Sequence, residues 1–221
     1  MRLWSVLLAG PVLFLAGVVG VSVWLGATGV PPERIGAEAA GYAPQLLAGV
    51  LLGLAVIAWR LPLAALWAVP APRRAMVDAG LGAVVGAVLA LAYLTVLAPL
   101  LTELQALGDY VPPGEVLATV SASIPLFFLA NVLLAPVVEE TIYRGLGLRE
   151  LTQRHGRVVA VVLSCAAFGV LHWTGGLWYM VLTGVVAGGS FTALALWRGG
   201  LVAPFAAHLT LNMIEFAYAA N

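Results

Sequence analysis

Long runs of apolar residues, separated by short loops, dominate this 221-residue chain. The first run covers residues 3–25, about 23 residues, which as a helix would span the roughly 30 Å hydrocarbon core of a bilayer. Hydrophobic residues make up 62% of the sequence and charged residues only 9%, whereas average soluble proteins carry roughly 25% charged residues. Because so few charged residues cannot cover a water-facing globule, the composition predicts a membrane protein.

Seven apolar segments are long enough to be candidate membrane spans. They cover approximately residues 3–25, 44–59, 78–101, 116–150, 158–173, 177–197 and 201–218. We interpret the first as a retained helix, because the apolar region of a cleaved signal peptide is usually shorter. The predicted fold is an all-α, polytopic membrane helix bundle of seven to eight helices in one integral membrane domain. Its N-terminal transmembrane helices occupy 1–110 and a helical core occupies 111–221.

Arginine placement predicts the orientation of this bundle. All ten basic residues are arginines, and eight of them gather in alternate loops: Arg2, then Arg60, Arg73 and Arg74, then Arg149, Arg154 and Arg157, then Arg198. The intervening loops hold Arg34 beside Glu33 and Glu38, or the acidic group Glu103, Asp109 and Glu115. The positive-inside rule therefore predicts a multi-pass protein of the cell membrane with a cytoplasmic N-terminus and an external C-terminus. The net charge of zero gives no sign of a nucleic-acid partner.

Two adjacent glutamates and an arginine interrupt the fourth apolar segment, in the stretch APVVEETIYRGLG at 135–147. Glu140 and Arg144 are at i and i+4, so they lie on one helix face and can form a pair. Glu139 is rotated from Glu140 by about 100°. We expect Arg144 to hold Glu140 ionised, which leaves Glu139 free to exchange a proton. The alternative is a solvated helix end at the membrane surface.

Two later segments repeat the i, i+4 spacing. Phe168 and His172 form one pair, and His208 and Asn212 form the other, with Glu215 one turn further on. Taken alone, each polar pair is explained by hydrogen bonds that hold helices together. Polar pairs on three separate membrane helices are better explained by one shared internal site.

Carboxylate, imidazole and carboxamide groups together suit the attack of water on an amide. Burial disfavours the charged form of a carboxyl group, which suits a glutamate to general-base work. One histidine could orient the water, while the other and an asparagine donate hydrogen bonds to an oxyanion. No cofactor is expected; if a metal took part, Glu139, His172 and His208 would be the zinc ligands. A covalent route through Cys165 is a weaker alternative.

The depth of the site constrains the helix that carries Glu139. If this helix began at Val116, Glu139 would lie near the inner surface, too far along the bundle to meet His172 and His208. We therefore expect the helix to begin near Phe128, after a break at Pro125, and to continue to about residue 151.

Three motifs occur in a fixed order: EETIYR at 139–144, FGVLH at 168–172 and HLTLN at 208–212. Together they resemble the motifs of the CAAX protease and bacteriocin-processing family, also called the ABI family, which is related to the type II CAAX prenyl endopeptidases. The resemblance covers roughly residues 120–215. It implies that 111–221 is a catalytic core and that the protein is an intramembrane endopeptidase. Family members are often labelled metalloproteases, but the resemblance favours a metal-independent, glutamate-based mechanism.

The resemblance also implies roles for individual residues. Glu139 would act as general base on a water, helped by His172. His208 and Asn212 would form the oxyanion hole. The residues that shape the site would be Glu140, Arg144 and Phe168.

The expected partners are the lipid bilayer and a membrane-embedded or lipid-modified protein or peptide substrate. Two other functions fit the same residues. Buried Glu and His side chains also form the proton relays of membrane transporters. In a non-catalytic bacteriocin-immunity or scaffold protein, the polar pairs would only fasten helices together.

Overall fold

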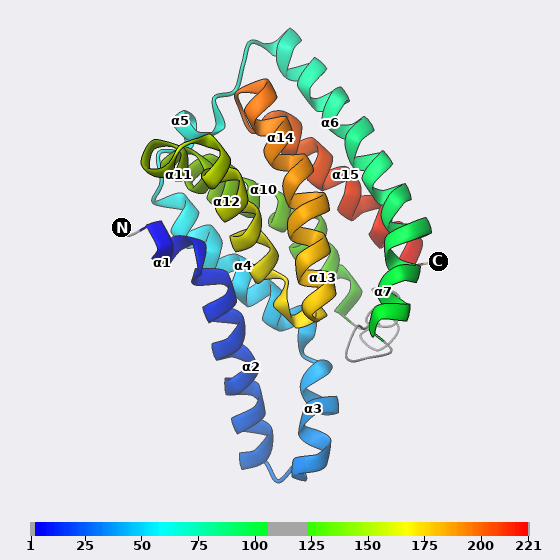
Figure 1. Ribbon diagram of the computed structural model, residues 1–221. Helices are drawn as coiled ribbons and strands as arrows, with labels where there is room; N and C mark the ends of the chain where they lie inside the picture. Colours follow the sequence, from blue (N-terminus) through cyan, green and yellow to red (C-terminus); the bar gives the residue numbers. More distant parts are fainter. Residues whose placement is uncertain (1–2, 106–122, 221) are drawn as a thin grey trace.

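The computed structural model describes residues 3–105 and 123–220, and within these ranges every regular element is helical (Figure 1). The first half contains α1 (Leu3–Leu7), α2 (Ala9–Ala27), α3 (Pro32–Ala40), α4 (Ala43–Trp59), α5 (Leu63–Trp67), α6 (Pro72–Ala92), η1 (Tyr93–Leu97) and α7 (Ala98–Gln105). The second half contains α9 (Ile124–Phe127), η3 (Phe128–Leu134), α10 (Ala135–Glu139), η4 (Glu140–Gly147), α11 (Leu148–His155), α12 (Arg157–Leu171), η5 (Trp173–Gly175), α13 (Leu177–Leu182), η6 (Thr183–Ala187), α14 (Gly188–Arg198) and α15 (Val202–Ala219). The predicted all-α class is confirmed. The predicted boundary at 110/111, the residues Asp109 and Glu115, and the start at Val116 lie outside the described residues.

The described residues of all seven predicted spans lie mainly in helices. Four continuous helices are long and apolar enough to cross a membrane: Ala9–Ala27, Pro72–Leu104, Ile124–His155 and Leu177–Arg198. A fifth span results if α3 and α4, which are bent by 63° at their junction, are counted together. The remaining two predicted spans correspond to α12, a shorter apolar helix, and α15, which carries His208, Asn212 and Glu215. The polytopic bundle is confirmed, and the count of seven crossings stays a prediction.

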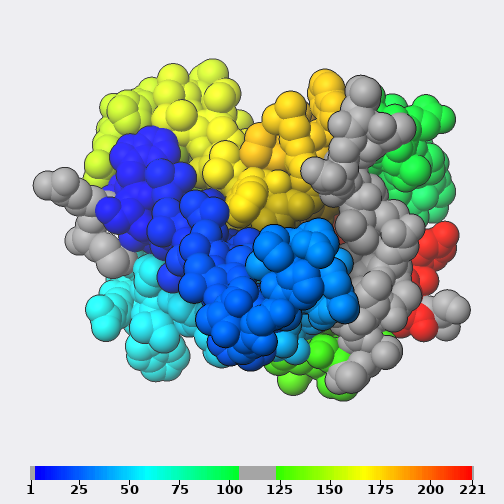
Figure 2. All heavy atoms as spheres, turned by 90° about the horizontal axis from the view of Figure 1, so that it is seen from below, coloured from blue at the N-terminus to red at the C-terminus, as the bar shows by residue number. Residues whose placement is uncertain are grey.

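The bundle surrounds α10, which lies near its middle, while α2 and α3 project together from one end (Figure 1). Viewed from that end, the atoms of α2 and α3 lie in front of the centre of the molecule (Figure 2). The outward faces of the long helices are apolar, as membrane helices require: Val12, Val19 and Val23 of α2 are each more than half exposed.

The helix that carries Glu139 is continuous from Ile124 to His155, but part of it is wound as a π-helix. The two π-helical stretches are η3 and η4, the second of which begins at Glu140. Pro125 lies in the first turn, where its missing N–H costs no hydrogen bond, so the helix begins at Ile124, about a turn before the predicted Phe128. Short π-helical insertions are frequent at functional sites because they change which side chains share a face.

An ion pair joins the start of α6 to the end of α14. The Arg198 guanidinium donates from Nε to Oδ1 of the buried Asp78 at 2.6 Å. Arg74 donates to the main-chain oxygen of Arg198, also at 2.6 Å. Three arginine-rich connections therefore meet at this end of the bundle, because Arg149 of α11 also lies 3.4 Å from the main-chain oxygen of Ala65 in α5.

Glycines bring α6 and α15 into main-chain contact along their length. Gly82 and Gly86 are one turn apart on α6, and both are buried. A Cβ atom at Gly82 would overlap the main-chain oxygen of Ala203, and one at Gly86 would overlap that of Ala207. Small residues at i and i+4 permit this close approach of membrane helices. The contact fixes the height of α15, which carries His208 and Asn212.

Gly86→Ala is therefore expected to destabilise the folded protein by roughly 1–3 kcal/mol, because the added methyl group overpacks the contact with Ala207. The matched control is Gly80→Ala on the same helix. Gly80 is exposed, and a methyl group added there would have no atom within 4 Å, so alanine should be neutral or stabilise by up to about 1 kcal/mol. Denaturant unfolding in detergent micelles measures the free energy of unfolding of both variants. Equal changes in the two variants would contradict the close contact between Gly86 and Ala207.

Candidate functional site

Most of the predicted site residues line one cavity of about 690 Å³. Its lining includes Glu139 from α10, Phe168 and His172 at the end of α12, and His208 and Asn212 from α15. Glu140 and Arg144 lie behind this wall and are fully enclosed. The structure thus brings all seven predicted residues together, although they come from three segments far apart in the chain.

Arg144 is held by contacts on several sides of its guanidinium. Its Nη1 donates to Glu140 Oε1 at 3.1 Å, and Nη2 donates to the main-chain oxygen of Gly188 at 3.1 Å. The guanidinium carbon lies 4.0 Å from the ring centroid of Phe168, a cation–π contact. Both side chains of the Glu140–Arg144 pair have 0% exposure. The predicted pair is present, and Phe168 covers its cation.

His208 connects the two glutamates. Its Nδ1 lies 3.0 Å from Glu140 Oε1, and because an ionised carboxylate only accepts hydrogen bonds, the imidazole donates its Nδ1–H. Its Nε2 lies 3.9 Å from Glu139 Oε2. Phe191 stacks on the imidazole with ring centroids 4.8 Å apart and an interplanar angle of 21°. The ring is therefore held so that Nε2 faces Glu139.

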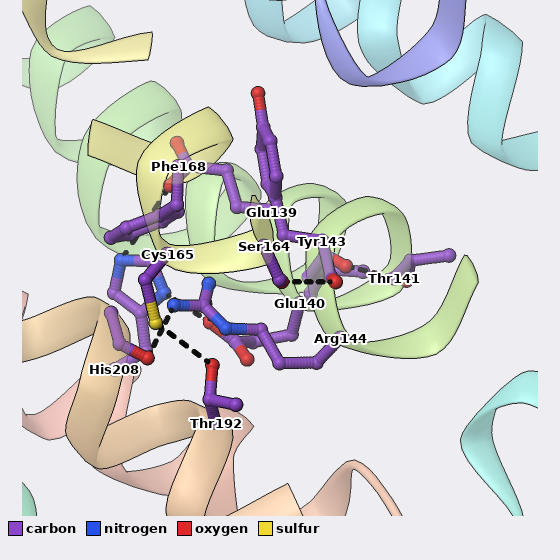
Figure 3. Close-up of polar contacts among 12 residues, drawn as sticks. Glu139, Glu140, Thr141, Tyr143, Arg144, Ser164, Cys165, Phe168, Thr192 and His208 are labelled. Atoms are coloured by element: carbon purple, nitrogen blue, oxygen red, sulfur yellow. Dashed lines mark hydrogen bonds and ion pairs between the residues drawn. The ribbon is translucent and has the colours of Figure 1, made fainter. Parts of the chain in front are cut away.

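Glu139 has a different environment from Glu140, although the two are adjacent in sequence. Its side chain points toward Phe168, away from the Glu140 and Arg144 side chains (Figure 3). It is only 4% exposed, and its Oε2 has no hydrogen-bond partner among the described residues. A carboxylate without a partner inside an apolar bundle is costly. Glu139 thus lines the cavity without a described group that neutralises its carboxylate at hydrogen-bond distance.

His172 caps the end of α12. Its Nδ1 lies 2.9 Å from the main-chain oxygen of Phe168, and because a carbonyl only accepts, the neutral ring carries its proton on Nδ1. The main-chain N–H of His172 donates to Gly169 rather than to Phe168, so that carbonyl is free for the side chain. The lone pair of Nε2 is left to face the cavity.

Asn212 is held by a main-chain oxygen that the π-helical winding sets free. Its Nδ2 donates to the carbonyl of Asn131 at 2.8 Å. The N–H of Ala135, which would bond to Asn131 in an α-helix, instead donates to Ala130. The next residue, Pro136, has no N–H to offer. One of the two amide hydrogens of Asn212 is therefore used for positioning, and the other is left for the predicted oxyanion.

Several contributors to the site were not predicted from the sequence. Phe191 was missed because an apolar side chain on an apolar helix carries no signal. The oxygen of Asn131 was missed because it belongs to the main chain, although Pro136 was a clue that a carbonyl upstream would lack its partner. Ser164 was also missed; its hydroxyl donates to the main-chain oxygen of Tyr143 at 2.9 Å and ties α12 to η4.

The alternative zinc ligands are Glu139, His172 and His208. Among the described residues, no group of three or more His, Cys, Asp or Glu side chains is spaced to hold a metal ion. The Nδ1 atoms of His172 and His208 are both engaged in hydrogen bonds, so a metal would have to bind each ring at Nε2. The side chains would therefore have to move closer together to coordinate zinc. Cys165 is a free thiol that contacts the Thr192 hydroxyl at 3.7 Å.

Comparison with known proteins agrees with the motifs. Residues 121–214 match the family model described as type II CAAX prenyl endopeptidase Rce1-like, a range that contains all seven predicted site residues. The match confirms the resemblance to the CAAX protease family. No curated protein and no solved structure matches the chain.

Two ion pairs on the same long helix allow the buried one to be tested. Glu140→Ala should destabilise the protein by about 3–5 kcal/mol, because Arg144 would be left buried without its counter-ion. Glu150→Ala is the control, since Glu150 and Arg154 have the same i, i+4 spacing but are 37% and 52% exposed. That change should cost less than about 1 kcal/mol. Denaturant unfolding in detergent micelles measures the change in the free energy of unfolding for both variants. A change below about 1 kcal/mol for Glu140→Ala would show that Arg144 finds another partner.

Proposed function

We propose that this chain, whose residues 121–214 belong to the Rce1-like type II CAAX prenyl endopeptidase family, hydrolyses a peptide bond by means of a water activated by Glu139. The family match supports an endopeptidase of membranes in general. The glutamate-based mechanism is our inference from the geometry. The observation that carries it is the contrast between Glu140, whose Oε1 accepts hydrogen bonds from two donors, and Glu139, which lines the cavity and accepts no hydrogen bond from a described side chain.

In this mechanism Glu139 accepts a proton from a water while the water oxygen attacks the scissile carbonyl carbon. His172 orients that water by accepting a hydrogen bond at Nε2. The tetrahedral oxyanion then accepts hydrogen bonds from the second amide hydrogen of Asn212 and from His208. When the His208 ring carries a proton on both nitrogens, its Nε2–H is the donor and its charge lies against Glu140.

The intermediate then collapses. Glu139 transfers its proton to the leaving nitrogen, the C–N bond breaks, and the products are a carboxylic acid and an amine. The acid then gives its proton to the amine, which leaves a carboxylate and an ammonium group. The lining of the cavity is largely aliphatic and aromatic, which favours a membrane-embedded or lipid-modified protein or peptide as substrate.

Glu139→Gln is expected to lower the rate of peptide cleavage by about 10²–10⁴, the usual contribution of a general base. The measurement is cleavage of a peptide library by the purified protein in lipid nanodiscs. The control is Glu150→Gln, an exposed position on the same helix, which should leave the rate unchanged. Glutamine keeps the shape of the side chain, so unfolding curves should coincide. Full activity of Glu139→Gln would reject the mechanism.

The same preparation separates the alternatives. Metal-assisted hydrolysis, with zinc bound to the enzyme, requires that a chelator abolish cleavage and that pure protein contain stoichiometric zinc. A proton-coupled transporter would lose solute uptake in Glu139→Gln without any cleavage in the parent protein. A scaffold or immunity protein would show neither activity.

We also infer that the end of the bundle where the arginine-rich connections meet is cytoplasmic, which places the N-terminus inside and the C-terminus outside. Arg60, Arg74, Arg149, Arg154 and Arg198 belong to these connections. Alkaline phosphatase is active only where its disulfides form, so its fusion to the C-terminus should be active. Fusion after residue 155 should be inactive. An active fusion after residue 155 together with an inactive fusion at the C-terminus would show that the protein has the opposite orientation.

A further inference from the structure

A third carboxylate, Glu215, lines the cavity that holds the candidate catalytic residues. It lies on α15 one turn beyond Asn212, further from the arginine-rich end of the bundle. Its neighbours in the cavity lining include the aromatic rings of Phe127 and Phe216. The mechanism above does not use this residue.

No described residue donates a hydrogen bond to Glu215 or forms an ion pair with it. Glu215 is partly buried, and two fully buried carboxylates of the described bundle have ion-pair partners that Glu215 lacks: Asp78 pairs with Arg198, and Glu140 pairs with Arg144. The chain has no lysine, and its ten arginines include none between residues 75 and 143. Its only cation in the C-terminal helix pair, Arg198, is already bound to Asp78. The described part of the chain therefore offers Glu215 no counter-ion.

An unpaired carboxylate in apolar surroundings destabilises the folded state, because its hydration is lost without compensation. The cost is recovered when a bound group supplies the missing donor. The cavity lining contains the carboxylates of Glu139 and Glu215 but, among the residues that the structure describes, no lysine or arginine, so the carboxylate of Glu215 complements a cation rather than an anion.

We propose that Glu215 is a specificity-determining residue, which binds a lysine or arginine side chain of the substrate. This inference rests on the proposed endopeptidase function. Glu215 follows His208 by seven residues, so it lies about 10 Å further along α15. An extended peptide covers that distance in about three residues. The recognised cation is thus about three residues from the scissile bond.

The test uses synthetic apolar peptides of about 20 residues, identical except for Lys, Gln or Glu at one scanned position. Binding is measured to the Glu139→Gln protein in lipid nanodiscs, so that no peptide is cut. At the recognised position the Lys peptide should bind at least about tenfold more tightly than the Gln peptide, as expected of a charged hydrogen bond. Adding Glu215→Gln should make the two affinities equal.

Two further variants separate recognition from a structural effect. Glu215→Lys should reverse the preference, so that the Glu peptide binds most tightly. Glu103→Gln removes a carboxylate that is exposed and outside the cavity lining, and should keep the preference for Lys. Equal affinity for Lys and Gln peptides at every position, or no binding at all, would overturn the inference.

Cleavage of the same peptides by the protein with Glu139 intact tells the two proposals apart. A Glu215-dependent preference in binding without any cleavage would leave the recognition site standing and remove the endopeptidase function. Glu139-dependent cleavage at equal rates for Lys and Gln peptides would support the endopeptidase function and reject the recognition site at Glu215.

Discussion

The interior of this bundle depends on one carboxylate, that of Glu140. Its Oε1 accepts hydrogen bonds from Arg144 of its own helix and from His208 of α15. Each of these groups would be costly to bury alone in an apolar bundle, but together they nearly satisfy one another. The same contacts place His208 beside Glu139 and bring the Arg144 guanidinium over the ring of Phe168. Charge burial and the shape of the site are therefore the result of the same interactions.

Main-chain carbonyls without helical partners hold further polar side chains in place. Pro136 and the π-helical winding leave the oxygen of Asn131 for the amide of Asn212. Pro11 has no N–H to donate to Leu7, and the hydroxyl of Tyr143 donates to that oxygen at 3.1 Å. The end of α12 provides a carbonyl for His172 in the same way. In lipid a free carbonyl must find a donor within the protein, so each one restrains a polar side chain that reaches it.

Much of the site could be predicted because intramembrane polar residues are rare and i, i+4 spacing fixes a face. That reasoning identified the Glu140–Arg144 pair and the separate direction of Glu139. It could not identify Asn131 or Phe191, because a main-chain oxygen and an apolar ring leave no mark in an apolar sequence. The spans were located from their hydropathy, but the bend between α3 and α4 and the π-helical stretches were not. Those features depend on tertiary packing, which local composition does not encode.

The glycine contact between α6 and α15 limits the faces across which a molecule in the lipid can reach the cavity. At Gly82 and Gly86 the main chains of α6 and α15 touch with no side chain between them, so the two helices cannot part there without losing this packing. In the endopeptidase that we propose, a substrate that diffuses in the plane of the lipid would therefore enter across another face of the bundle. It would then meet His208, Asn212 and Glu215 on α15.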